Sequence, residues 1–128
     1  KKLYLKVADL INNNEKPKVL PTQSLKEVIV EMTQKRLGIT AVVDTGNKLI
    51  GIITDGDLRR MLEKNTAIDS IKAGDIMTSN PKTIEPDKLA VDALNLLRKN
   101  EITQLAVTAN GNYEGILHLH DLIREGLI

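Results

Sequence analysis

Cysteine, tryptophan and phenylalanine are absent from this chain, and only two tyrosines are present. Without cysteine there is no disulfide framework, no thiolate zinc site and no cysteine nucleophile, and we expect a cytoplasmic location. Two tyrosines cannot supply the stacking platforms of single-strand binders, and a net charge of +1 offers no basic surface for a phosphate backbone. We therefore expect no nucleic-acid partner.

Long apolar runs are missing as well. No stretch approaches the roughly 20 apolar residues that span a bilayer, so we expect no membrane partner. The start, Lys1 to Leu5, lacks the apolar core of a signal peptide, and because no initiator methionine is present we expect a piece of a longer protein. With 41% apolar and 27% charged residues in 128, the chain can still bury a core.

What the chain does contain is an internal repeat. When the sequence is shifted by 64 residues, positions 16–64 match positions 80–128 without a gap, with ten identities in 49 places. An opening segment recurs with a shift of 66, as Val7 to Ile11 and again as Ala73 to Met77. Self-similarity of this kind indicates two copies of one structural unit.

Each copy has the pattern β-α-β-β-α. We expect three parts in the chain, namely an N-terminal segment with the first repeat at 1–64, a connector of about one helical turn at 65–72, and the second repeat at 73–128. One unit of this size has too little core to be secure alone. The sequence therefore predicts an α+β fold in which the two halves pack face to face about a pseudo-twofold axis.

The elements can be placed from local patterns. Strands are predicted at 18–20, 39–43 and 49–53 in the first repeat, and at 83–84, 102–107 and 113–117 in the second. Ser24 and Glu27 have the spacing of a capping box, and Asp87 is the expected cap of the matching helix. The apolar residues expected to face the core from the helices are Leu25, Val28, Ile29, Met32, Leu58, Met61, Leu62, Leu89, Ala93, Leu96, Leu97, Leu122, Ile123 and Leu127.

Identity between the copies is concentrated where the last strand meets the final helix. The first turn of a helix leaves backbone N–H groups free and carries a partial positive charge, which favours an anion. Thr54 or His118 can donate a hydrogen bond to a phosphate there. Three residues later, Asp57 or Asp121 can accept hydrogen bonds from the vicinal hydroxyls of a ribose.

Apolar strands beside these junctions can form a slot for a base. The residues expected to line it are Val19, Leu20, Ala41, Val42, Ile52 and Ile53 in the first repeat, and Thr83, Ile84, Leu105, Ala106, Ile116 and Leu117 in the second. Since aromatic residues are so scarce, a bound base would sit between aliphatic side chains.

Other interpretations of the same residues stay open. Thr-x-x-Asp and His-x-x-Asp at a helix start are also plain capping patterns that bind nothing. His118 and His120 stand two apart beside Asp121, so with a third ligand they can form a zinc site. Arg59, Arg60 and Arg124 can assist a phosphate or simply be solvated. A catalytic pair of aspartates lacks a nucleophile or proton-transfer partner at fixed spacing, so we expect no enzyme in this fragment.

The residues resemble a known family. The two copies of Gly-h-h-[Thr or His]-x-x-Asp-h, where h is apolar, and the opening Asp75-Ile76-Met77 are similar to a tandem pair of CBS domains, also called a Bateman module. The resemblance covers essentially the whole chain. It implies a regulatory module that holds an adenosyl or other nucleotide between its halves and that associates into dimers. A dimerisation module without a ligand is the alternative.

Three segments, 38–44, 54–60 and 118–122, more specifically resemble the C-terminal part of bacterial D-arabinose 5-phosphate isomerases. The resemblance implies a sugar isomerase (SIS) domain in the parent chain, which makes arabinose 5-phosphate for Kdo in lipopolysaccharide or capsule. It implies no required cofactor and a nucleotide effector such as AMP, ATP or CMP-Kdo. Two departures stand out: Ala41 and Leu105 occupy positions where many CBS domains have proline, and His118 replaces a hydroxyl.

Overall fold

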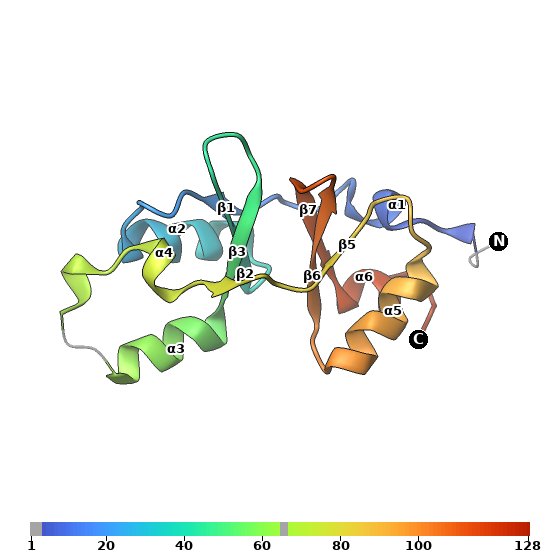
Figure 1. Cartoon of the computed structure of the whole chain (residues 1–128). Helices are drawn as coiled ribbons and strands as arrows, with labels where there is room; N and C mark the ends of the chain where they lie inside the picture. Colours follow the sequence, from blue (N-terminus) through green and yellow to red (C-terminus); the bar gives the residue numbers. More distant parts are fainter. Residues whose placement is uncertain (1–3, 65–66) are drawn as a thin grey trace. The chain divides into compact units, whose positions relative to one another are not determined.

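The computed structural model describes residues 4–64 and 67–128, so the start of the predicted N-terminal segment and the first two residues of the predicted connector lie outside the described residues. The chain divides into two compact units. The first-repeat unit is Lys16–Pro81, and the second-repeat unit is Lys82–Ile128 together with the described part of Lys1–Glu15. Each unit combines a small mixed sheet with helices (Figure 1), which confirms the predicted α+β class.

The first-repeat unit contains a four-stranded sheet in the order β1-β2-β3-β4. Its strands are β1 (Lys18–Val19), β2 (Ile39–Val43), β3 (Leu49–Thr54) and β4 (Thr78–Ser79). β1 runs parallel to β2, whereas the β2–β3 and β3–β4 pairs are antiparallel. Its helices are α2 (Leu25–Lys35), α3 (Asp55–Lys64), the 3₁₀ turn η2 (Ile68–Ser70) in the connector, and α4 (Ala73–Ile76).

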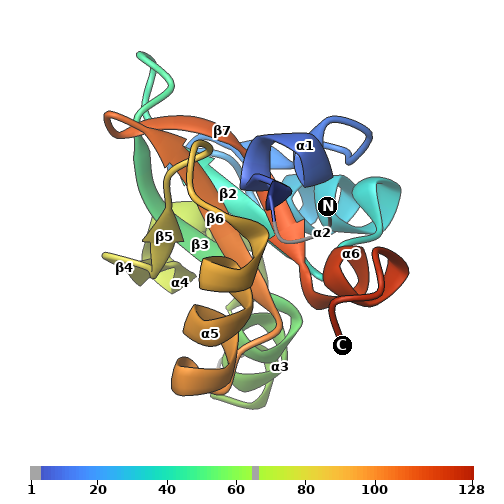
Figure 2. The same ribbon diagram turned by 90° about the vertical axis from the view of Figure 1, so that its right-hand side faces the viewer.

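The second-repeat unit contains a three-stranded sheet in the order β5-β6-β7. Its strands are β5 (Thr83–Ile84), β6 (Gln104–Ala109) and β7 (Asn112–His118), and its helices are α1 (Val7–Ile11), α5 (Ala90–Asn100) and α6 (Leu119–Arg124). Figure 2 looks onto this unit, with β5 to β7 beside α1, α5 and α6. Within residues 4–64 and 67–128, no helix has the length and apolar character of a membrane span.

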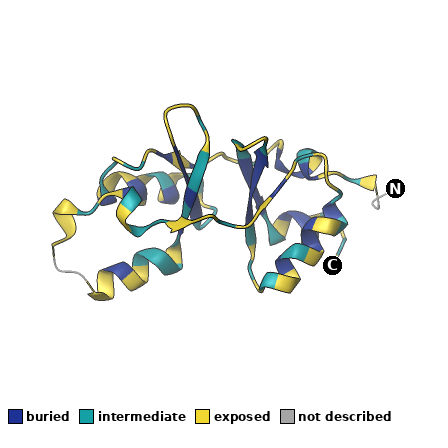
Figure 3. Cartoon of the chain, in the orientation of Figure 1, coloured by how far each residue is buried: buried dark blue, intermediate teal, exposed yellow. Residues whose placement is uncertain are grey.

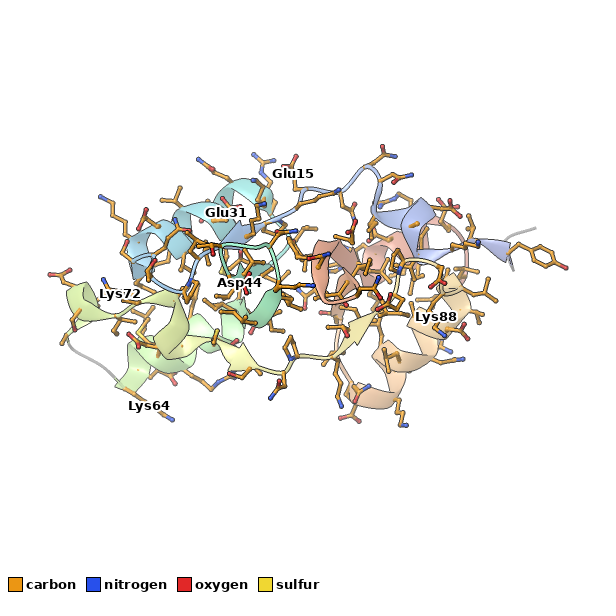
Figure 4. All side chains as sticks on the ribbon, turned by 45° about the horizontal axis from the view of Figure 1, so that its top comes forward. Glu15, Glu31, Asp44, Lys64, Lys72 and Lys88 are labelled. Carbon is orange, nitrogen blue, oxygen red and sulfur yellow. The ribbon has the colours of Figure 1, made fainter. Side chains whose placement is uncertain are left out.

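The two opening segments have exchanged places between the units. α1 precedes the first repeat in sequence but packs on the second, where the Val7 N–H donates to the Lys88 carbonyl at 2.9 Å. α4 makes the matching contact in the first-repeat unit, where the Ala73 N–H donates to the Gln23 carbonyl at 2.9 Å. Figure 4 labels Lys88 and Lys72. The backbone of Lys72 forms an isolated antiparallel β-bridge with Ser24, next to the second of these contacts.

The repeats do not align with one constant shift. Helices α2 and α5 begin at 25 and 90, a difference of 65. Gly51 and Gly115, at matching register positions of β3 and β7, differ by 64. The hairpin turn accounts for the difference. Residues 44–48 lie between the paired residues Val43 and Leu49 in the first unit, whereas only residues 109–112 lie between the matching pair Thr108 and Tyr113 in the second. The ungapped alignment is therefore wrong before the hairpin turn.

The shift also explains why the predicted helix cap at Asp87 is wrong. Ser24 caps α2, accepting from the Glu27 N–H at 3.2 Å, while the Glu27 carboxylate accepts from the Ser24 N–H at 2.9 Å. The structural counterpart of Ser24 is Leu89, which is the N-cap of α5 and supplies no side-chain cap. A helix does not need a side-chain cap when its packing is strong.

Each unit has its own core, and Figure 3 shows buried positions along the strands and on one side of the helices. The core cluster of the first-repeat unit is Val19, Val28, Met32, Val42, Ile53 and Ala73. That of the second is Val7, Leu10, Ile11, Ile84, Ala90, Ala93, Leu94, Leu97, Leu105, Val107, Leu117 and Leu122. Ile29, Leu62 and Ile123, predicted to face inward, are exposed. Each follows a buried residue by one position, which turns it about 100° away from the core.

Candidate functional site

The junction of β3 and α3 holds Thr54 and Asp57 together. The Thr54 N–H donates to Asp57 Oδ2 at 2.9 Å, and the Thr54 hydroxyl lies 3.2 Å from the same oxygen. The Asp57 N–H donates back to Thr54 Oγ1 at 3.3 Å. The other oxygen, Asp57 Oδ1, accepts from Arg60 at 2.8 Å, with the Thr78 hydroxyl 3.5 Å away. One carboxylate oxygen thus caps the helix, and the other faces an exposed guanidinium.

Gly56 lets this guanidinium lie close to the first turn of α3. A Cβ at Gly56 would stand 3.2 Å from one terminal nitrogen of Arg60. The side chain of Arg60 is 60% exposed, whereas that of Asp57 is 12% exposed. Since an exposed ion pair contributes about 0.2–1 kcal/mol, another partner can displace Arg60 from the carboxylate at small cost.

The junction of β7 and α6 has the same framework with different neighbours. The His118 N–H donates to Asp121 Oδ2 at 2.8 Å, and Arg124 pairs with Oδ1. The side-chain amide of Asn14 also donates to Oδ2, at 2.9 Å, and reaches the Ile116 carbonyl at 3.1 Å. Asp121 is 3% exposed. This carboxylate is therefore buried and receives hydrogen bonds on both oxygens.

The His118 ring is half-buried and acts as an acceptor. The His120 N–H donates to His118 Nδ1 at 3.0 Å, so the neutral ring carries its proton on Nε2. Burial lowers the pKa of His118 below its ordinary value of 6.5, and His120 lowers it further, while the Asp121 carboxylate acts in the opposite direction. His118 is thus held neutral, with Nε2–H as its free donor.

The two histidine rings are close but lack a third metal ligand in the part of the chain that the structure describes. Their centroids are 4.3 Å apart. No group of three or more His, Cys, Asp or Glu side chains among residues 4–64 and 67–128 is arranged to hold a metal ion. The Nδ1 lone pair of His118 is engaged by a backbone N–H as well.

The strand residues predicted to line a base slot divide between the two faces of each sheet. Residues paired across neighbouring strands point to the same face of the sheet, and successive residues along one strand point to opposite faces. Those that fill the core clusters are Val19, Val42, Ile53, Ile84, Leu105 and Leu117. Those on the opposite face are Ala41, Ile52, Thr83, Ala106 and Ile116, which follow from the pairs of Ala41 with Ile52 and of Ala106 with Thr83 and Ile116. Leu20 follows β1 and is exposed.

Within each unit, the predicted residues border separate pockets. Val19 and Leu20 line a pocket of about 350 Å³ with the Asp44 loop. Thr83 and Ile84 line one of about 570 Å³ along α5. Asp121 borders a third, of about 290 Å³, whose other walls are mostly polar residues from the end of α6 and from the N-terminal segment. The two predicted parts of a site, an aspartate and apolar strands, thus do not share one of these pockets.

Sequence reasoning missed Asn14 and Thr78. Both contact an aspartate of the motif from a distant part of the chain, Asn14 across 107 positions and Thr78 across 21. Asn14 ends the run Asn12-Asn13-Asn14, which has the composition of a loop. No local pattern distinguishes it from its two neighbours.

Comparison with known proteins gives close relatives that are longer. The chain is 38% identical to the arabinose 5-phosphate isomerase KdsD of Yersinia pestis over 100% of its own length and 39% of the relative. It is 44% identical to KdsD of Francisella tularensis over 97% of its own length and 38% of the relative. The chain thus spans about two-fifths of these relatives.

Solved structures share the fold. The crystal structure of CBSX2 in complex with AMP is 25% identical, with a TM-score of 0.75 and coverage of 96% of both chains. A CBS domain protein from Pyrobaculum aerophilum, complexed with AMP, is 21% identical, with a TM-score of 0.82 over 92% of this chain and 90% of that one. The family profile described as CBS domain matches residues 7–64 and 73–127. The chain therefore belongs to the CBS domain family and carries two consecutive copies.

Proposed function

We propose that this chain is the regulatory, nucleotide-binding CBS module of a D-arabinose 5-phosphate isomerase and has no catalytic role of its own. The support is its 38–44% identity to KdsD proteins, of which it spans about two-fifths. The partner we propose in the same parent chain is a SIS isomerase domain, working toward Kdo for lipopolysaccharide or capsule. A cytoplasmic location belongs to the same proposal.

The proposed ligand is a nucleotide such as AMP, ATP or CMP-Kdo. The observation that carries this proposal is the Asp57 carboxylate at the start of α3, which has one oxygen committed to the helix cap and the other paired with an exposed arginine. A ribose diol can replace Arg60 at Oδ1, and the released guanidinium can then turn to the phosphate. The AMP in the CBSX2 structure supports a nucleotide in this fold.

The base would lie at the sheet face opposite the core clusters, where Ile52 is partly exposed and Ala41, Ala106 and Ile116 are buried. Ala41 and Ile52 share that face in the first-repeat unit, and Ala106 and Ile116 share it in the second. Ile52 is aliphatic, so its exposed part offers dispersion contacts without aromatic stacking. His118 and Asp121 are the corresponding polar pair for a second ligand in this proposal.

Regulation would follow from linkage. A ligand that binds one arrangement of the module more tightly shifts the population toward it, and the attached catalytic domain is biased by that shift. The size of the effect is limited by the ratio of the ligand's affinities for the two arrangements.

Isothermal titration calorimetry with AMP, ATP, CMP and CMP-Kdo tests the proposal. Asp57→Asn keeps an oxygen for the helix cap but removes the charge, so we expect at least about a tenfold loss of affinity. Asp55→Asn is the matched control, because Asp55 is exposed in the same turn. Absence of binding by all four nucleotides at millimolar concentration would refute the ligand proposal.

A second candidate function is dimerisation, with or without a ligand. Large apolar side chains are exposed on helices of both units, among them Leu62 at 48% and Ile123 at 49%. Covering such surfaces is a common reason for self-association. Analytical ultracentrifugation of Leu62→Ser and Ile123→Ser tests this function. A wild-type chain that is monomeric at all accessible concentrations would rule it out.

A further inference from the structure

The N-terminal segment is tied to the second junction by a single side chain. The Asn14 amide donates from Nδ2 both to Asp121 Oδ2, at 2.9 Å, and to the Ile116 carbonyl, at 3.1 Å. It is part-buried there. A side-chain amide with both donors engaged on two elements of a compact unit fixes the backbone that carries it.

In the first-repeat unit a strand occupies the corresponding place. Ile52, the counterpart of Ile116, pairs with Thr78 of β4, and Gly51 pairs with Ser79. The sheet of the second-repeat unit ends at β7 without a matching strand among the described residues. Asn14 thus satisfies the Ile116 carbonyl with a side chain where the first unit uses a strand.

The aspartate of the second junction is also more deeply buried than that of the first. Asp121 Oδ2 accepts from the His118 N–H and from Asn14, Oδ1 accepts from Arg124, and the side chain is 4% exposed. The His120 N–H, in the first turn of α6, is taken by the His118 ring. Arg60 and Arg124 are similarly exposed, at 60% and 65%, so the arginines do not distinguish the junctions. The side chain of Asp57 is 12% exposed and that of Asp121 is 4% exposed, so a ribose reaches Asp57 more readily.

We infer that the two junctions have different roles. The His118–Asp121 junction is a latch, in which Asn14 is the positioning residue that holds the N-terminal segment, residues 4–15, on the second-repeat unit. This part of the inference is independent of any ligand. A second part rests on the proposed function: the Thr54–Asp57 junction alone binds the nucleotide, so each chain takes one ligand.

Hydrogen exchange measured by mass spectrometry tests the latch. For Asn14→Ala we expect about tenfold faster amide exchange at α1, with exchange in residues 16–64 unchanged. Asn12→Ala is the matched control, because Asn12 is exposed and helical in backbone conformation. Asn14→Asp places a carboxylate against Asp121 and the Ile116 carbonyl, so it should loosen α1 further. Unchanged exchange in both Asn14 variants would overturn the latch.

Titration with AMP tests the second part. We expect one AMP per chain for the wild type, loss of binding for Asp57→Asn, and unchanged stoichiometry for Asp121→Asn. Two AMP molecules per chain, or loss of binding for Asp121→Asn with Asp57→Asn unaffected, would overturn the assignment. If no variant and no wild-type sample binds AMP, ATP, CMP or CMP-Kdo, the proposed function fails, while the exchange experiment still decides the latch.

Discussion

The two junctions carry one sequence pattern and have two different environments. In both, an aspartate three residues after the end of a strand accepts a backbone N–H at 2.8–2.9 Å and pairs with an arginine three residues later. The side chain of Asp57 is 12% exposed, and its further neighbours are the hydroxyls of Thr54 at 3.2 Å and of Thr78 at 3.5 Å. Asp121 has the Asn14 amide and is 4% exposed. A shared motif thus specifies the local cap and the paired arginine, and the junctions differ in their contacts with distant residues and in the burial of the aspartate.

Replacing the two aspartates should give the largest difference between the junctions. Asp121→Ala leaves three donors without their acceptor, two of them in a buried site, so we expect a loss of about 3 kcal/mol in the free energy of unfolding. Asp57→Ala removes a cap whose partners can turn to water, so we expect about 1 kcal/mol. Urea denaturation of both variants measures the two values. Equal losses of unfolding free energy would mean that the Asn14 contact adds nothing to the stability of the Asp121 junction.

The sequence predicted most elements because their signals are local. Both hairpins and both strand-to-helix junctions lie where runs of β-branched residues and turn residues indicated. Capping between Thr54 and Asp57 also follows from spacing alone. These features depend on residues within a few positions of one another, so one chain is enough to predict them.

What the sequence did not predict depends on distant contacts. The identical pair Pro17 and Pro81 supports a constant shift of 64 between the repeats. In the structure, the strands and helices before the hairpin turn correspond with a shift of 65, so Pro21 corresponds to Pro86. Chance identities in the ungapped alignment therefore placed the starts of α2 and α5 one residue out of register. The Asn14 contact joins segments 107 positions apart, and no periodicity extends that far. The exchange of α1 and α4 between the units has the same cause.

The starts of α2 and α5 offer a second, smaller difference. Ser24→Ala removes the side-chain cap of α2 and should destabilise the protein by about 1 kcal/mol. The capping interaction also holds the pKa of Glu27 below 4.5, chiefly through the Ser24 backbone N–H. Asp87→Ala is the matched variant, and since Asp87 is not the cap of α5 we expect a change within about 0.5 kcal/mol. Thermal unfolding of both variants checks this. A larger loss of stability for Asp87→Ala would mean that Asp87 is the N-cap of α5 after all, as the ungapped alignment predicts.

The smallest expected effect is a dependence of stability on pH. It arises because the second junction has His118 where the first has Thr54. Burial and the neighbouring His120 hold the pKa of His118 below 6.5 in the folded protein, so the unfolded chain binds more protons at mildly acidic pH. Stability should therefore be complete above about pH 6.5 and should decrease as the pH falls from there toward the folded pKa, levelling off below it. The change should be small, because the Asp121 carboxylate offsets part of the shift and solvent screens the half-exposed ring.

His118→Thr gives the second junction the hydroxyl of the first and isolates this effect. A threonine hydroxyl can accept an N–H at the start of α6 without titrating, as Thr54 does for Asp57. Urea denaturation between pH 5 and 8 should then show a flatter profile than the wild type in the window below pH 6.5. His120→Thr is the control, because His120 is exposed, and it should keep most of the slope. If His118→Thr and the wild type have the same slope, the imidazole is not held neutral by its surroundings, and the two junctions differ only through Asn14.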